Sequence, residues 1–159
     1  MSPRRTKPGP GGSHLDGISS FLNVDLHIRS RASLEPLLKE WTHLARIPDA
    51  KLPQRARWVL VNLRGQPKNA EAAIRALVRL VENLSAAGRR AWRNARSRTF
   101  DIGIQAGTRP YSFEDVRLAD ETLQGVARVH GNILVTVYAP RDATPEGERA
   151  ASTGRPTKR

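Results

Sequence analysis

The chain has 159 residues, no cysteine and a formal net charge of +12 at neutral pH. The missing cysteines exclude disulfides and thiolate metal sites, and no apolar run reaches the roughly 18 residues that a membrane-spanning helix needs. We therefore expect one cytoplasmic domain with no membrane partner, no metal and no cofactor, whose charge draws it toward acidic partners.

Alternation and helical spacing predict the elements of the first half of the chain. Residues 1–20 are rich in Pro and Gly and should form a disordered tail. Residues 21–29 alternate apolar and polar side chains, as in a strand with one buried face. Ser33 is placed to cap a helix that carries Trp41 in its apolar stripe, and residues 58–64 have the composition of a second strand.

The second half contains the longest helical pattern. Asn69 is placed to cap this helix, whose apolar residues recur at helical spacing as far as Leu84. The patterns after it predict a short helix over residues 85–98, a strand over 100–105, an edge strand over 111–118, a helix from Asp120 to Gly131 and a strand over 133–138. Residues 140–159 are again polar and should be disordered, so the ordered domain spans residues 21–139.

The order of these elements mixes strands and helices without an internal repeat, which favours an α+β fold. The strands alternate in polarity instead of being continuously apolar, so helices should cover one face of the sheet and leave the other exposed. We predict a mixed, mainly antiparallel sheet of about five strands with the helices packed on one face.

Most of the positive charge lies in the middle of the chain, where residues 46–98 hold thirteen Lys and Arg against three Asp and Glu. Five arginines there surround Trp92, namely Arg89, Arg90, Arg93, Arg96 and Arg98. Their guanidinium groups suit phosphates or carboxylates, and the ring suits stacking on a base. Two alternatives stay open: Trp92 packs the short helix onto the sheet with the arginines in water, or the arginine content reflects coding bias.

The exposed face of the predicted sheet is a second candidate site. It should display polar and aromatic side chains, among them Asp25, His27, Trp58, Arg64, Asp101 and Tyr138. An imidazole beside two carboxylates can move a proton or hold a divalent cation, which makes Asp25, His27 and Asp101 a candidate catalytic group. Aromatic rings on such a face can instead stack unpaired bases. An ordinary solvated strand face shows the same pattern, and no established catalytic or phosphate-binding motif occurs in the chain.

Three segments carry a resemblance to known proteins: FLNVDLHIRS, RTFDIGIQAG and ETLQGVARVHGNILVTVY. They resemble small uncharacterised bacterial α+β proteins that share a strand, a short hairpin, a helix and a final strand ending in Tyr. Some relatives of this kind look like immunity proteins, which bind a partner and catalyse nothing. The resemblance implies an α+β fold and a protein partner, and it assigns no site residue. The basic middle of this chain departs from the acidic surfaces expected of proteins that block nucleases.

Together these observations favour a non-catalytic binding protein that engages a protein partner through its basic surface, with Arg89, Arg93 and Arg96 as contacts. The alternative is a nucleic-acid-binding protein that uses the same arginines, with Trp92 or Trp58 stacking on bases. An enzyme that uses Asp25, His27 and Asp101 is the third hypothesis.

Overall fold

The computed structural model describes residues 18–42, 45–46, 57–63, 65, 67–108 and 115–140, with the backbone alone described at 45–46. Strands and helices follow one another in a mixed order that includes a two-residue strand, Ala45–Arg46, that the sequence does not predict. They are β1 (Ser20–Ser30), α1 (Glu35–Trp41), β2 (Ala45–Arg46), β3 (Trp58–Leu63), α2 (Ala70–Glu82), α3 (Ala86–Arg93), β4 (Ala95–Gln105), α4 (Asp120–Arg128) and β5 (Asn132–Tyr138). The fold class is α+β, as predicted.

The strands form a mixed sheet in the order β2-β3-β1-β4-β5. β1 is antiparallel to both β3 and β4, whereas β4 is parallel to β5. β2 has two residues and pairs only with the end of β3, so four strands make up the main sheet of the described chain, not about five. The predicted strand over 111–118 accounts for this correction, because residues 115–119 form no strand and residues 111–114 lie outside the described part.

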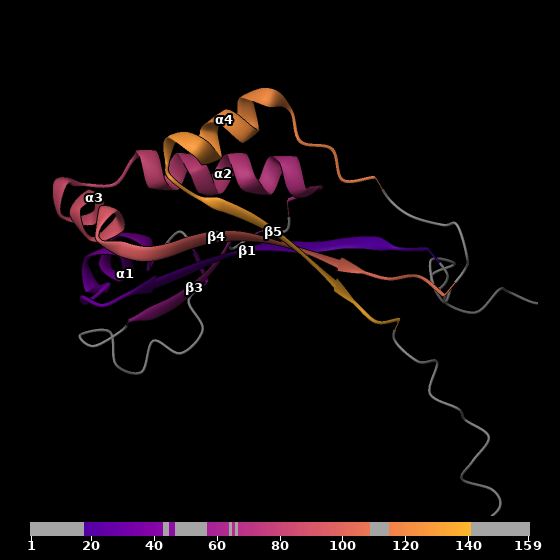
Figure 1. Ribbon diagram of the computed structural model, residues 1–159, viewed down its shortest axis with the longest axis horizontal. Helices are drawn as coiled ribbons and strands as arrows, with labels where there is room; N and C mark the ends of the chain where they lie inside the picture. Colours follow the sequence, from indigo (N-terminus) through magenta and orange to yellow (C-terminus); the bar gives the residue numbers. More distant parts are fainter. Residues whose placement is uncertain are drawn as a thin grey trace, which may run out of the picture.

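The core lies on one face of the sheet. Alternate residues of the strands are buried, and the register aligns Leu26 of β1 with Val61 of β3 and Phe100 of β4, each fully buried. Together with Trp41 of α1 and the buried stripe of α2 they form one cluster. Figure 1 shows α2 and α4 above the sheet, and α1 and α3 at the end where β1 finishes and β4 begins.

Side-chain caps determine where α2 and α3 begin. Asn69 accepts a hydrogen bond from the backbone N–H of Ala72 at 2.9 Å, which confirms the predicted cap of α2. Ser85 caps α3 in the same way through the N–H of Gly88. The prediction of helix as far as residue 98 is wrong beyond Arg93, because β1 pairs with residues 95–98 and draws them into β4. The cross-strand hydrogen bonds outweigh the high helix propensity of Ala and Arg there.

The sequence predicts that Asp120 caps α4, but a carboxylate from α2 stabilises the N-terminus of this helix instead. Asp120 is the first helical residue, and Ala119 before it has no capping side chain. Glu71 accepts hydrogen bonds from the N–H of Ala119, at 3.0 Å, and from the hydroxyl of Thr122. A carboxylate at this position also interacts favourably with the helix dipole.

Replacing Glu71 by alanine should therefore lower the free energy of unfolding by about 1–2 kcal/mol, the usual effect of removing an N-terminal cap. Urea denaturation monitored by circular dichroism measures the change. Glu82→Ala is the matched control, since Glu82 is exposed and bonds only the exposed Arg128, at 3.2 Å. Such an exposed pair contributes at most about 1 kcal/mol. Equal losses for the two variants would show that Glu71 does not act as a cap.

Within the described ranges, no helix has the length and apolar character needed to cross a membrane. The predicted tails lie almost wholly outside the described residues, at 1–17 and 141–159. The domain boundaries and the cytoplasmic location stay predictions.

Candidate functional site

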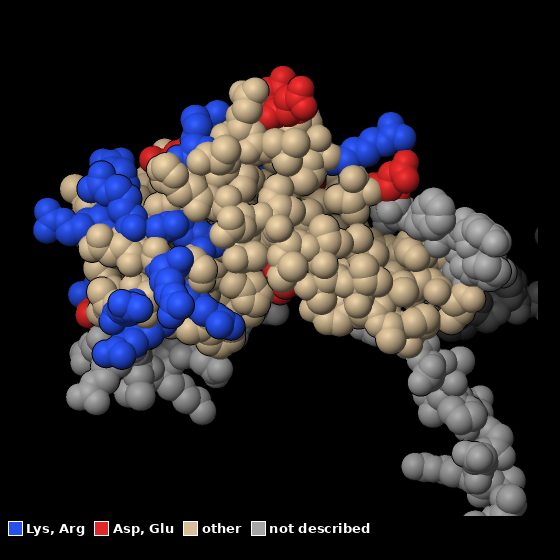
Figure 2. Space-filling view, viewed as in Figure 1, with Lys and Arg blue, Asp and Glu red and all other residues tan. Residues whose placement is uncertain are grey.

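Exposed arginines from four separate segments gather at one end of the molecule, which we call the basic end. Its members are Arg29, Arg31, Arg57, Arg89, Arg90, Arg93 and Arg96. The register places Arg29 beside both Trp58 and Ser97, so the end of β1 lies next to the beginnings of β3 and β4. Figure 2 shows the blue side chains crowded at this end. Among the described residues, none of the seven arginines forms an ion pair.

Hydrogen bonds connect the N-terminal end of α3 to α1. Glu40 of α1 accepts hydrogen bonds from both the N–H and the hydroxyl of Ser85, at 2.9 and 2.5 Å. The two helices come so close here that a Cβ atom on Gly88 would overlap the Glu40 carboxylate and lie 2.8 Å from a methyl group of Leu84. A larger residue at this position would require the Glu40 or Leu84 side chain to move. The arginines of α3 therefore project from a helix whose position is set by the fold.

Trp92 belongs to the core and not to the exposed surface. Its side chain is 4% exposed, its Nε1–H donates to the carbonyl of Val129 at 2.8 Å, and its ring packs edge-on against Trp41. The ring cannot stack on a base in this position. Trp92 therefore packs the short helix against the core instead of stacking on a base.

Arg98 is also part of the fold. Its guanidinium donates hydrogen bonds to the carbonyl oxygens of Trp92, Arg93 and Ala95, at 2.7–2.9 Å, and lies 5.7 Å from the centre of the Trp92 ring. Burial lowers the pKa of Arg98, through the cost of removing its charge from water. Arg98 and Trp92 therefore leave the set of predicted contact residues, while Arg89, Arg90, Arg93 and Arg96 remain in it.

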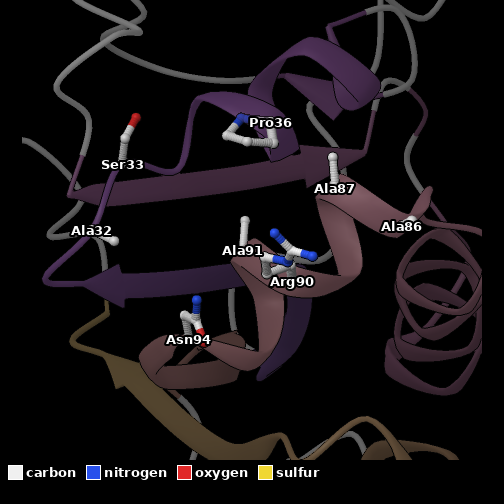
Figure 3. A pocket seen from close by; sticks show the side chains of 8 residues that line it. All are labelled: Ala32, Ser33, Pro36, Ala86, Ala87, Arg90, Ala91 and Asn94. Carbon is white, nitrogen blue, oxygen red and sulfur yellow. The ribbon is translucent and has the colours of Figure 1, made fainter.

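A shallow hollow lies at the foot of these arginines, between α3 and the segment that leads into α1. Its lining consists of Ala32, Ser33, Pro36, Ala86, Ala87, Arg90, Ala91 and Asn94. In Figure 3, Ala32, Ser33 and Pro36 lie across the hollow from α3, and the Arg90 guanidinium lies beside Ala91. The lining thus combines small apolar groups with one cationic group and two neutral polar groups, Ser33 and Asn94.

The exposed face of the sheet carries a row of polar side chains across four strands. The register pairs Asp25 of β1 directly with Asp101 of β4. Asp25 accepts a hydrogen bond from the amide of Asn62, at 2.6 Å, and Asp101 accepts one from the hydroxyl of Thr136, at 2.7 Å. His27 lies 3.6 Å from Asp101 through Nε2 and Oδ2. The structure therefore brings Asp25, His27 and Asp101 to neighbouring positions.

This polar row has a structural explanation, because the hydrogen bonds to its carboxylates link β3 to β1 and β5 to β4. No group of three or more His, Asp or Glu side chains in the described ranges has a metal-binding arrangement. The enzyme hypothesis stays a prediction, since no observation of the row identifies a reacting group or a substrate.

The two aromatic residues predicted on this face lie far apart. Trp58 of β3 is 48% exposed, 6.3 Å from the His27 ring and adjacent to Arg29 across the strands. Tyr138 is on β5, and β1 and β4 separate it from β3. The last predicted member, Arg64, lies outside the described residues.

Three members of the basic end were not among the predicted site residues: Arg29, Arg31 and Arg57. Each stands near the end of a strand, and strand ends meet at the edges of a sheet. The positions of these arginines near strand ends can be read from the sequence. Grouping them with the arginines of α3 requires knowing that β1 ends where β3 and β4 begin.

Comparisons with family models, with curated proteins and with solved structures found no match for this chain. The resemblance drawn from the sequence segments stays a prediction. The basic end is therefore the main structural indication of what this chain binds.

Proposed function

We propose that this chain is a non-catalytic binding protein whose basic end holds an acidic segment of a protein partner. The observation that carries the proposal is the hollow beside Arg90, which combines small apolar side chains with cations that have no acidic partner in the described chain. An acidic peptide with an apolar side chain offers the matching groups.

The two parts of the site contribute in different ways. The methyl and ring carbons of Ala32, Pro36, Ala87 and Ala91 can receive an apolar side chain and remove it from water, which contributes about 0.8 kcal/mol for each CH₂ group buried. The guanidinium groups of Arg89, Arg90 and Arg93 can pair with carboxylates on either side of it, and an exposed pair of this kind contributes about 0.2–1 kcal/mol. The arginines mainly accelerate the encounter and select for negative charge.

A protein segment fits these features better than a nucleic acid does. Phosphate groups would interact with the arginines but gain nothing from a lining of alanine and proline. The ring that was predicted to stack on bases, Trp92, is buried. On the sheet face beyond Trp58, the carboxylates of Asp25 and Asp101 would repel a phosphate chain.

Binding of a single-stranded nucleic acid is the second candidate, and one observation favours it. Trp58 is 48% exposed at the basic end, between Arg57 along the chain and Arg29 on the neighbouring strand. A base stacked on this ring would place its phosphates near two guanidinium groups, and such stacking contributes about 1–3 kcal/mol per base.

Fluorescence anisotropy with two labelled probes distinguishes the candidates. One probe is a peptide with a leucine flanked by Asp and Glu residues, and the other is a single-stranded oligothymidine. We expect the peptide to bind at low salt and the triple variant R89E/R90E/R93E to bind it at least about tenfold more weakly. Arg90→Glu alone should weaken binding in the same direction, and Arg117→Glu is its charge-matched control, because Arg117 is exposed and outside the basic end. No peptide binding at low salt contradicts the proposal.

Filling the hollow tests the apolar part of the site. Ala87 is exposed on α3 and lines the hollow, so Ala87→Leu should occupy the space while leaving every charge in place. We expect several-fold weaker binding of the peptide and unchanged binding of the oligonucleotide. The opposite pattern, with oligonucleotide binding lost in Trp58→Ala, would favour the second candidate.

A further inference from the structure

β5 is an apolar edge strand that neither the core nor the basic end accounts for. Every large apolar side chain of this strand is at least 37% exposed, and Val137 reaches 63%. The register with β4 places Ile133, Val135 and Val137 on the helix-covered face, and Leu134 and Tyr138 on the opposite face. An edge strand that is apolar on both faces is a common site of strand pairing with another chain.

The segment that contains β5 carries no charge, in contrast to the rest of the chain. From Val129 to Pro140 the sequence holds no Asp, Glu, Lys or Arg, although the protein has a net charge of +12. Figure 2 shows a tan surface over the centre of the molecule, well separated from most of the blue side chains of the basic end. Copies of so basic a protein repel each other through most of their surface. This neutral strand is the place where two copies can meet without facing charges.

The outer edge of β5 also has free backbone groups. The N–H of Ala106 donates to the carbonyl of Tyr138 at 2.9 Å, so Tyr138 directs its backbone groups toward β4. Backbone direction alternates along a strand, and therefore Ile133, Val135 and Val137 direct their N–H and C=O groups away from β4. In the described chain no strand pairs with this edge.

We propose that two copies of this chain associate through antiparallel pairing of β5 with β5, about a two-fold axis at Val135. This register is self-complementary over all seven residues of the strand. It places Val135 opposite the partner's Val135 and Ile133 opposite the partner's Val137, so apolar side chains meet on the helix-covered face. The outward backbone groups then form about six hydrogen bonds across the axis. The two sheets join into one, with the helices of both copies on the same side.

The neutral charge and the apolar side chains of β5 favour a second copy of the chain as the partner that pairs with it. An acidic partner would find no cation along β5, whereas a neutral apolar strand of the same length matches both its side chains and its edge. The inference is independent of the proposed function, because the dimer uses none of the arginines of the basic end.

Disulfide trapping tests this register directly, because the protein has no cysteine. In the proposed dimer the two Val135 Cα atoms form a hydrogen-bonded pair about 5.5 Å apart, a distance that a disulfide spans. We expect Val135→Cys to form a cross-linked dimer under mild oxidation, more than about tenfold faster than Leu123→Cys. Leu123 is a suitable control, since it is 43% exposed on α4. Equal rates for the two variants would overturn the proposal.

Sedimentation velocity of the unmodified chain over about a hundredfold range of concentration gives a second measurement. We expect a concentration-dependent dimer, at least about tenfold weaker in Val135→Lys because two ammonium groups then meet at the axis. An equimolar mixture of Val135→Lys with Val135→Glu should recover the dimer, and Trp58→Lys, on the distant strand β3, should leave it unchanged. A chain that stays monomeric at every concentration, or a Val135→Lys dimer of unchanged affinity, contradicts the inference.

Discussion

Replacing Trp92 by alanine should lower the free energy of unfolding by about 3–5 kcal/mol, the range for removing a large buried side chain. The ring is 4% exposed and lies 6.3 Å from the ring of Trp41, so its loss leaves a cavity between α3, α1 and the sheet. The carbonyl of Val129 also loses its indole donor, at 2.8 Å. Urea denaturation monitored by circular dichroism measures the effect.

Two further variants separate the parts of this effect. Trp92→Phe keeps most of the apolar volume but removes the N–H donor, and we expect a loss of about 1–3 kcal/mol, the cost of a buried group left without its partner. Arg90→Ala changes an exposed residue of the same helix and should alter stability by less than about 0.5 kcal/mol. A loss below about 1 kcal/mol for Trp92→Ala would show that the ring is not a core residue.

Replacing Arg98 by alanine should lower the free energy of unfolding by about 2–3 kcal/mol, because three carbonyl oxygens at the end of α3 and the start of β4 lose a charged donor. Arg98→Lys should recover only part of this loss. An ammonium group is a point charge, and it cannot reach three carbonyls in the directions that a planar guanidinium serves at once. The same denaturation experiment measures both variants.

Arg96 provides the matched control for this prediction. It lies two residues before Arg98 and is exposed, with no hydrogen bond or ion pair in the described chain. Arg96→Ala should therefore change stability by less than about 0.5 kcal/mol. If Arg96→Ala and Arg98→Ala cost the same, the bonds that Arg98 makes to the backbone do not stabilise the fold.

The sequence predicts where the arginine cluster lies along the chain, but not which of its side chains belong to the core. Arg89, Arg90 and Arg93 were predicted on a short helix, and that helix exists and exposes them. The same pattern could not reveal that Trp92 and Arg98 hold α3 and β4 together. A ring among alanines and arginines is compatible with either burial or exposure, and only the position of α1 and β4 decides between them.

The boundary between α3 and β4 is also set by tertiary contacts and not by local sequence. Residues 95–98 favour a helix by local propensity, yet β1 lies within hydrogen-bonding distance and pairs with them. The cap of α4 is another case, because Glu71 is distant in sequence and no local pattern links it to Thr122. Interactions between segments far apart in the chain overrule weak local preferences.

The sequence by itself determined the α+β class, the alternation of β1, the apolar stripe of α2 and its cap at Asn69, since each depends on residues within a few positions of one another. The tertiary structure alone decided which strands are neighbours, and with that the assembly of the basic end from Arg29, Arg57 and α3. It also decided that the apolar strand β5 lies at an edge and not at the centre of the sheet. Strand order depends on which distant segments pack best together, and periodicity along one segment carries no information about that choice.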